Sequence, residues 1–277
     1  MNLVWITDTH LNFISLEKIQ AFCRSIKECN PDAVILTGDI SESPLLFHHL
    51  LVLEKELEPA PIFFVCGNHD YYHSSIKEIR QTLTERYSYP EYEKGNLYKG
   101  AYWLGSSGVV PLTNSVALVG HDGWYDGGYA NYFKSKLDMN DYYVIKELVH
   151  IVNPTRELRY NTIRELAKES ADYIRGNLIE AFRQGFEAVY VATHVPPFRE
   201  NAMYKGKQSD DDWMPHFSSK IMGDMLLEVA EKNPDKNIIV LCGHSHGFAF
   251  YKPLPNLQSH TGEVEYKFPE VNKTFVL

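Results

Sequence analysis

The feature of this sequence that most constrains its fold is a short apolar run that recurs along the chain and ends each time in a polar cluster. Each run has four or five residues, is rich in Val, Ile and Phe, and is too short to form a helix. Because the runs are apolar throughout, we expect strands that are buried on both faces. The six runs are Leu3–Ile6, Ala33–Leu36, Ile62–Cys66, Val116–Val119, Ala188–Ala192 and Ile238–Cys242.

Helical patterns separate several of these runs. Ser15–Cys29 begins with a residue that can cap a helix and carries apolar residues at helical spacing, until Asn30-Pro31 ends the pattern. Leu45–Leu57 and Ser74–Arg86 have similar patterns. Strands that alternate with helices predict a layered α/β fold.

Two parts of the chain depart from this alternation. Residues 133–185 have a mostly helical pattern without an obvious strand, so we expect a helical insertion that lies over or beside the sheet and supplies no ligand. After His246, the segments Phe248–Tyr251, Val264–Phe268 and Thr274–Leu277 predict short antiparallel strands at a sheet edge. The chain has 277 residues and no clear linker, so we expect residues 1–277 to form a single domain.

The polar clusters hold the residues that can do chemistry. If the strands are mostly parallel, their carboxyl ends share one edge of the sheet, where open α/β sheets build their sites. Residues more than two hundred positions apart in the sequence would then meet. The clusters are Thr7-Asp8-Thr9-His10, Thr37-Gly38-Asp39, Gly67-Asn68-His69-Asp70, Thr193-His194 and Gly243-His244-Ser245-His246.

The converging side chains form a mixed oxygen and nitrogen donor set without sulfur. Such a donor set is better suited to a site for Mn, Fe, Zn or similar ions than to a structural zinc site, because structural zinc favours Cys ligands. Asp8 and His10 are two residues apart, as are His244 and His246, so each pair can face the same way at a strand end. Gly38, Gly67 and Gly243 precede ligands in three of the clusters, where they permit sharp turns and a close approach of the backbone to a bound group.

Two divalent ions about 3.5–4 Å apart are a recurrent device for phosphoester hydrolysis. A carboxylate is needed between the ions because they repel each other, and Asp39 is the natural bridging candidate, since it stands alone after its strand. A leaving alkoxide needs a proton, which His69 is placed to supply.

All of these blocks together resemble the calcineurin-like metallophosphoesterase superfamily. The series Asp8-x-His10, Gly38-Asp39, Gly67-Asn68-His69-Asp70, His194 and Gly243-His244-x-His246 has the family's five blocks in the family's order. The resemblance implies a four-layer sandwich of two β-sheets flanked by helices. It implies that a first metal takes Asp8, His10, Asp39 and His246, and that a second takes Asp39, Asn68, His194 and His244. His69 would then be an acid or a transition-state stabiliser rather than a ligand.

One departure from the family pattern bears on the substrate. The protein Ser/Thr phosphatases of the family have an Arg soon after the Gly-Asp block, whereas this chain reads Gly38-Asp39-Ile40-Ser41-Glu42. The block pattern is more similar to the bacterial cyclic-nucleotide phosphodiesterase and small-molecule branch. We therefore expect metal-dependent hydrolysis of a small phosphoester, either a diester or a monoester.

Two other functions use the same residues. A non-catalytic scaffold of this fold would be expected to lack ligands or His69, and this chain has them all. A nuclease could use the same two metals, but the chain has 27 Lys and Arg against 36 Asp and Glu, with no long basic run. That balance argues against nucleic acid as the partner.

The cysteines and the hydropathy bear on location. None of the four cysteines forms a CxxC pair, and free thiols are typical of a reducing compartment. No apolar stretch approaches the roughly 20 residues that a membrane span needs. Chemically important residues begin at Asp8, which leaves no room for a signal peptide. We expect a cytoplasmic protein that does not bind a membrane.

Several residues have two interpretations. His121 and Asp122 lie near the metals or form a strand-end turn, and Arg199 either clamps a phosphate or is a solvated loop residue. The run Asp210-Asp211-Asp212 is another cation site or a solvated acidic loop. Aromatic residues line a substrate wall or pack the helical insertion; they are Trp124, Tyr125, Tyr129, Tyr132 and Phe133.

Overall fold

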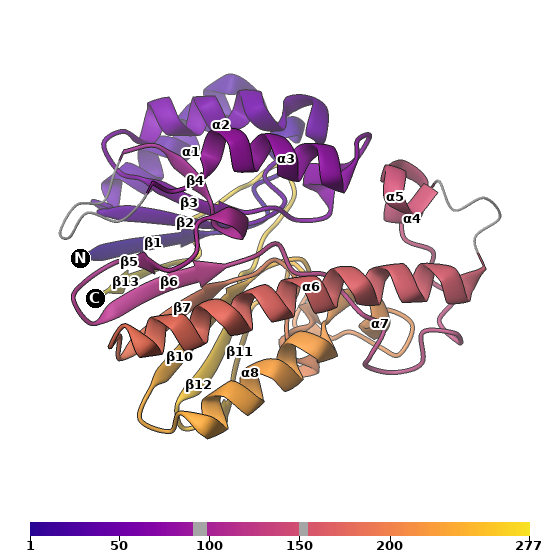
Figure 1. The fold of residues 1–277 in the computed structure, drawn as a ribbon. Helices are drawn as coiled ribbons and strands as arrows, with labels where there is room; N and C mark the ends of the chain where they lie inside the picture. Colours follow the sequence, from indigo (N-terminus) through magenta and orange to yellow (C-terminus); the bar gives the residue numbers. More distant parts are fainter. Residues whose placement is uncertain (91–98, 150–154) are drawn as a thin grey trace.

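Two β-sheets pack face to face in the computed structural model, which describes residues 1–90, 99–149 and 155–277 (Figure 1). The first sheet contains β1 (Asn2–Ile6), β2 (Ala33–Thr37), β3 (Ile62–Val65), β4 (Ala101–Trp103) and β13 (Lys273–Val276), in the order β13-β1-β2-β3-β4. The second contains β5 (Val110–Pro111), β6 (Val116–Gly120), β7 (Ala188–Ala192), β10 (Asn237–Cys242), β11 (Ala249–Leu254) and β12 (Leu257–Thr261), in the order β11-β12-β10-β7-β6-β5. All six apolar runs thus form the expected strands.

Helices cover the outer faces of both sheets. The helices α1 (Leu16–Glu28), α2 (Ser43–Leu57) and α3 (Ile76–Tyr87) cover the first sheet, and α6 (Arg156–Arg183) and α8 (Lys220–Lys232) cover the second (Figure 1). The shorter elements are α4 (Asp141–Val144), α5 (Lys146–Val149), α7 (Met214–Phe217), β8 (Met203–Tyr204) and β9 (Lys207–Gln208). This arrangement confirms the four-layer sandwich. Within the described part of the chain, no helix combines the length and the hydrophobicity that crossing a bilayer requires.

The strands are apolar throughout because both of their faces are buried. In β1, Leu3 and Trp5 point into the core between the two sheets, whereas Val4 and Ile6 point into the core beneath α1 to α3. All four side chains are at most 3 % exposed. Alternation between two cores removes the polar face that a half-buried strand would show.

The strands that precede the polar clusters are parallel within each sheet. In the first sheet, β1 pairs with β2, β2 with β3 and β3 with β4 in parallel. In the second, β7 lies between β6 and β10, and both pairings are parallel. Their carboxyl ends therefore meet at one edge of the sandwich, as the sequence pattern predicts.

Residues 133–185 are mainly helical where the structure describes them, but their main helix is a layer of the sandwich rather than an addition to it. Ala171, Ile174 and Leu178 of α6 pack in the same core as Val119 of β6 and Val191 of β7. The helices α4 and α5 are short and precede it. His150, a potential ligand in this region, lies outside the described residues.

The C-terminal strands differ from the expectation in one place. β11 and β13 form near the expected positions and pair in antiparallel fashion with β12 and β1. The expected strand Val264–Phe268 is wrong, because this segment contains only an isolated bridge between Glu265 and Phe268. Instead, β12 forms between β11 at the sheet edge and β10, with which it pairs in parallel. Its sequence, LQSHT, has too few apolar residues to stand out as a buried strand.

Candidate metal centre

The proposed ligands sit in tight loops that leave the strands at this edge. Five of them have a left-handed backbone, with φ of 47° at Asp8, 41° at His10, 49° at Asp39, 68° at His244 and 57° at His246. This conformation is uncommon for residues other than Gly and costs free energy, so its repetition in one place indicates a functional constraint.

Two glycines let these loops approach one another. A Cβ atom on Gly67 would lie 2.1 Å from Oδ1 of Asp39, and one on Gly243 would lie 1.9 Å from Oδ2 of Asp8. No side chain could be accommodated at such distances without moving the carboxylates. Gly67 and Gly243 thus let their loops approach the carboxylates of Asp39 and Asp8 closely.

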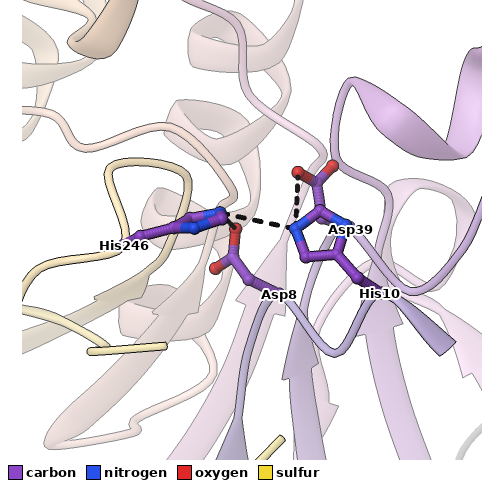
Figure 2. A group of neighbouring side chains, drawn as sticks. All are labelled: Asp8, His10, Asp39 and His246. Atoms are coloured by element: carbon purple, nitrogen blue, oxygen red, sulfur yellow. Dashed lines mark hydrogen bonds and ion pairs between the residues drawn. The ribbon is translucent and has the colours of Figure 1, made fainter. Parts of the chain in front are cut away.

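A first group of donors contains Asp8, His10, Asp39 and His246, whose ligand atoms all lie within 4.8 Å of one another (Figure 2). Nε2 of His10 lies 3.4 Å from Nε2 of His246 and 3.7 Å from Oδ2 of Asp39. Nε2 of His246 lies 3.3 Å from Oδ1 of Asp8. Three separate loops, which follow β1, β2 and β10, contribute to this group.

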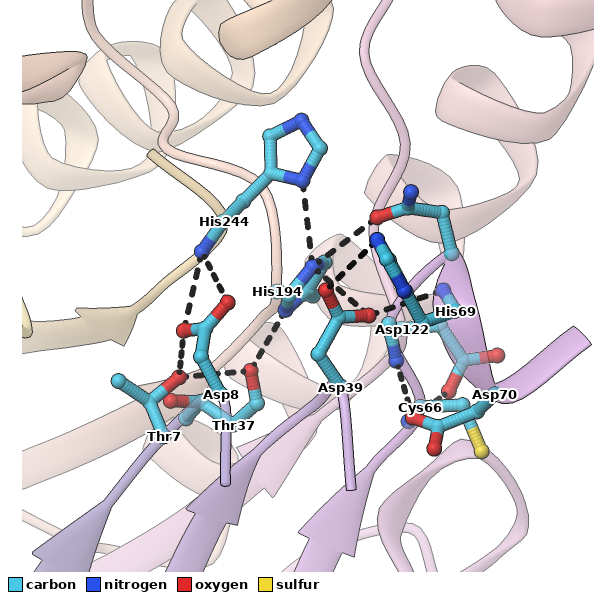
Figure 3. A network of polar contacts seen from close by, with 12 residues as sticks. Thr7, Asp8, Thr37, Asp39, Cys66, His69, Asp70, Asp122, His194 and His244 are labelled. Atoms are coloured by element: carbon cyan, nitrogen blue, oxygen red, sulfur yellow. Dashed lines mark hydrogen bonds and ion pairs between the residues drawn. The ribbon is translucent and has the colours of Figure 1, made fainter. Parts of the chain in front are cut away.

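A second group shares Asp39 and adds His194 and His244. Figure 3 shows His194 between Asp39 and His244, and its Nε2 lies 3.4 Å from Oδ1 of Asp39 and 3.2 Å from Nδ1 of His244. Oδ1 of Asn68 is 3.3 Å from the same nitrogen. The two carboxylate oxygens of Asp39 thus face different groups. Neither group contains a residue from the described part of 133–185.

Carbonyl groups fix which ring nitrogens of the second group carry protons. Nδ1 of His194 lies 2.8 Å from the carbonyl oxygen of Thr37, and Nε2 of His244 lies 2.9 Å from that of His216. A carbonyl can only accept, so these two nitrogens donate. Nε2 of His194, which faces Asp39, and Nδ1 of His244, 3.2 Å from it, are then the atoms available to a metal.

The charges of the centre fit divalent cations. Burial is the main cause that lowers the pKa of His10 to about 3 and that of His244 to about 4, so both rings are neutral donors. Burial is also the largest single effect on the pKa of His194 and acts to lower it. The charges of Asp39 and Asp8 and the hydrogen bonds to Asp39 and Thr37 together outweigh burial and raise this pKa to about 10. In the metal-free protein, the positive charge of protonated His194 thus offsets the negative charge of the buried Asp39 carboxylate. A bound metal ion would supply this positive charge in place of the proton. The carboxylate, amide and imidazole donors are types that divalent metal ions accept.

Asp141 is a residue of the site that the sequence pattern does not reveal. It lies in α4, is fully buried, and its Oδ1 accepts from Nδ2 of Asn68 at 3.0 Å and from the hydroxyl of Tyr72 at 2.7 Å. Its Oδ2 accepts from the hydroxyl of Tyr125 at 2.8 Å. No motif surrounds it, so only the folded chain connects it with Asn68.

His69 lies beside the centre and outside both donor groups. Its Nε2 is 3.9 Å from Oδ2 of Asp39, its backbone N–H donates to Oδ1 of the same carboxylate at 2.9 Å, and its side chain is 20 % exposed. The ring stacks on that of Tyr72, with centroids 4.3 Å apart. The side chain is therefore held at the solvent side of Asp39.

Asp122 braces a loop rather than facing the metals. Its carboxylate accepts from the backbone N–H of Cys66, from Nε1 of Trp103, from the hydroxyl of Tyr71 and from Nε of Arg80, at 2.5–3.0 Å. Cys66 directly follows β3, so these bonds hold the start of the loop that carries Asn68.

The other residues with two interpretations lie outside the donor groups. His121 is buried against the ring of Tyr173, and Arg199 is exposed. Asp210 caps its own loop by accepting from two backbone N–H groups. Of the aromatic residues, Trp124, Tyr125 and Tyr132 are buried and pack in the core, Tyr129 is partly buried and Phe133 is half exposed.

Comparisons with known proteins agree with this geometry. The sequence pattern of the family described as calcineurin-like phosphoesterase matches residues 1–248. A transmembrane protein with metallophosphoesterase domain from Danio rerio is 29 % identical over 85 residues, which are 28 % of this chain and 18 % of that protein. The uncharacterized metallophosphoesterase YkuE from Bacillus subtilis (strain 168) is 31 % identical over 74 residues, which are 25 % of this chain and 26 % of that protein. The matches thus span about a quarter or less of these relatives' length.

Solved structures share the fold over most of the chain. Phosphopantetheinyl hydrolase (PptH) from Mycobacterium tuberculosis has a TM-score of 0.59 at 10 % identity, covering 96 % of this chain and 89 % of that one. A dimetal phosphatase from Danio rerio has a TM-score of 0.56 at 13 % identity, covering 95 % and 87 %. At these identities the likeness concerns the fold alone. With the family match over most of its length and the two donor groups that meet at Asp39, the chain belongs to the calcineurin-like phosphoesterase family.

Proposed function

We propose that the protein hydrolyses a small phosphoester at a centre of two divalent metal ions that share Asp39. The observation that carries this proposal is the position of the Asp39 carboxylate, whose two oxygens face separate sets of donors. A single metal site would not need a second set of donors around the same carboxylate. Two adjacent sites need a negative charge between them, because two dications repel each other.

The donors divide between the two ions as the family resemblance implies. The first would be held by Asp8, His10, Asp39 and His246, and the second by Asp39, Asn68, His194 and His244. Bound there, the ions would supply a hydroxide at neutral pH and Lewis-acid polarisation of the phosphoryl oxygens. Mn, Fe and Zn all accept such a set of oxygen and nitrogen donors.

The chain's own residues position the reaction. Burial of the carboxylates and rings limits the water around the donors, and the carbonyl groups of Thr37 and His216 hold two rings in the orientation that presents a lone pair. Nε2 of His69, near Asp39 and partly exposed, is placed to give a proton to the leaving oxygen. That transfer matters most for esters whose leaving alcohol is weakly acidic.

The chain's charge supports a small substrate rather than a nucleic acid. The formal net charge is −9, and binding of a long polyanion depends on a basic face. A phosphodiester or phosphomonoester with a small leaving group would avoid that need, because the bound metal ions would neutralise charge on the reacting phosphate.

Metal removal and replacement test this proposal. The protein is stripped with a chelator, bound metal is measured by mass spectrometry, and activity is assayed with and without Mn²⁺ on a monoester, a diester, cyclic AMP and single-stranded DNA. We expect about two ions per chain to return together with activity on a small ester. Full activity in metal-free protein would overturn the proposal. Metal uptake without hydrolysis of any ester would indicate a scaffold, and a marked preference for DNA would indicate a nuclease.

A further inference from the structure

A pocket of about 750 Å³ opens beside the proposed centre and reaches His246, one of its donors. Its lining comes mainly from the segments that follow β10 and β12 and from the turn between β8 and β9. Much of this lining comes from residues 260–273, which lie beyond the part of the chain that matches the family. The pocket is therefore where this chain can differ from its relatives in substrate choice.

Tyr266 connects this pocket to the centre. Its ring centroid lies 4.5 Å from that of His10 and 4.8 Å from that of His246. The ring of Phe13, from the loop after β1, meets Tyr266 edge-on at 5.7 Å. One aromatic side chain thus contacts two proposed ligands of the first metal and also lines the pocket.

Large aromatic rings in this pocket remain open to solvent. Tyr204 is 52 % exposed, Phe248 64 %, Tyr266 43 % and Phe268 59 %. Apolar surface gathered in this way around a concave site is typical of ligand binding. Ring faces bind planar groups well, because every planar π-system can stack on them.

The charged residues of the pocket limit the charge that a bound planar group can carry. Glu263, Glu265 and Glu270 line it together with Lys205 and Lys273. Lys205 lies over the ring of Tyr204, 5.1 Å from its centroid. Among the described residues that line the pocket there is no arginine, so this lining lacks the forked donor that suits a second phosphate or a carboxylate.

We propose that Tyr266 and the aromatic pocket beside it bind a planar aromatic leaving group of the substrate, one that is neutral or cationic rather than anionic. This inference rests on the proposed phosphoester hydrolysis at the adjacent centre, and it names the class of ester that the enzyme prefers. Tyr266 acts as a specificity-determining residue through its ring rather than its hydroxyl.

The test compares two esters that differ in planarity and little in the acidity of the leaving alcohol. These are the 2-naphthylmethyl and cyclohexylmethyl esters, prepared both as phosphates and as methyl phosphodiesters. The metal-loaded protein is assayed as wild type and as Tyr266→Leu and Tyr266→Phe. Phe133→Leu is the matched control, since Phe133 is also half exposed and does not line the pocket.

Wild type and Tyr266→Phe are expected to prefer the naphthylmethyl ester. Tyr266→Leu should lower kcat/KM for this ester by about 5- to 100-fold, chiefly through KM, which is the range expected for one stacking contact. Tyr266→Leu should lower kcat/KM for the cyclohexylmethyl ester much less. Phe133→Leu should leave both rates unchanged.

Direct binding gives a second readout. Metal-free protein is titrated with 2-naphthalenemethanol, which has no phosphate, and its fluorescence is followed. We expect binding to wild type and to Tyr266→Phe, and binding about 5- to 100-fold weaker to Tyr266→Leu. The bound metal of each variant is measured in parallel, because Tyr266 also touches two proposed ligands.

The outcomes separate this inference from the function on which it rests. Equal rates on the two esters in wild type, or an equal loss on both in Tyr266→Leu together with lost metal, would overturn the role of Tyr266. Loss of the preference in Phe133→Leu would do the same. If no ester is hydrolysed with metal present while naphthalenemethanol still binds through Tyr266, the proposed function fails and the pocket assignment stands.

Discussion

The side-chain nitrogen of Asn68 donates to Oδ1 of the buried Asp141 at 3.0 Å. Because an ionised carboxylate can only accept, this bond decides which end of the Asn68 amide faces the centre. Oδ1 of Asn68 is left 3.3 Å from Nε2 of His194, among the donors of the second group. The short helix α4 thus controls a ligand that lies in the loop after β3.

Replacement of Asp141 by Asn should weaken metal binding without removing a proposed ligand. The new amide can present its own N–H group to Asn68, which removes the preference for the observed orientation. We expect metal affinity to fall about 10- to 100-fold, as is usual when the partner of a ligand is lost. Titration of metal-free protein with Mn²⁺ measures this. Asp138→Asn, the same change at an exposed residue three positions earlier, should leave the affinity unchanged.

Gly67→Ala should disrupt the centre through the carboxylate of Asp39. The added methyl group would lie 2.1 Å from Oδ1, so the carboxylate or the loop has to move. We expect loss of at least one bound ion and of most activity, measured by metal analysis and an ester assay. Gly176→Ala is the control, because a Cβ atom there meets nothing within 4 Å and Ala favours a helix by about 1 kcal/mol. Normal metal content in Gly67→Ala would contradict this reasoning.

Asp122→Ala should destabilise the fold rather than act on metal binding directly. Asp122 is fully buried, and its removal leaves the guanidinium of Arg80, whose side chain is 13 % exposed, with only the exposed Glu169 as an ion-pair partner. Loss of one member of a buried ion pair costs about 3–5 kcal/mol of unfolding free energy. Urea unfolding of metal-free protein measures the change. Asp172→Ala, which removes an exposed ion pair with Lys168, should change stability by less than about 0.5 kcal/mol.

The sequence predicts the strands that lead to the centre because each of them has a strong local signal. An apolar run buried on both faces, followed by a turn with Gly, can be recognised without knowledge of the fold, as for Ala33–Leu36 and Ile62–Cys66. The parallel order then places the side chains that follow at one edge. The clustering of the eight site residues could be expected for this reason.

The parts of the structure that the sequence does not predict depend on contacts between residues that are far apart in the sequence. β12 has a weak local pattern and becomes a strand because β10 and β11 provide partners on both sides. Asp141 is one acid among 36 acidic residues, and only folding brings it to Asn68, 73 positions away. Tyr266 lies in a segment expected to be a strand. Its proposed role depends on its contacts with the rings of His10 and His246, which the sequence pattern around Tyr266 does not reveal.

Asp39→Asn should lower metal occupancy and, with it, activity on every substrate. The substitution removes one negative charge from between the two groups and leaves a single oxygen where two now face His10 and His194. The amide cannot supply a donor oxygen to both sets. Metal analysis of the purified variant checks this. Full occupancy of two sites in Asp39→Asn would show that the carboxylate is not shared.

His69→Asn should leave the metals bound and slow the reaction, because His69 lies outside both donor groups. We expect turnover to fall by about 10²–10⁴-fold, the usual range for a general acid. The loss should be small for a nitrophenyl ester, whose leaving group needs little proton donation, and large for an alkyl ester. The control is His73→Asn, a change at an exposed His of the same loop whose ring pairs with Glu42.

The combination of the two measurements identifies the role of His69. Metal loss as severe as in Asp39→Asn would make His69 a ligand or a structural brace, despite the 3.9 Å between its Nε2 and the Asp39 carboxylate. If the variant retains metal and turnover falls equally on both esters, His69 stabilises charge on the phosphoryl group, because both reactions develop that charge. Only retained metal with a loss confined to the alkyl ester fits proton transfer to the leaving oxygen.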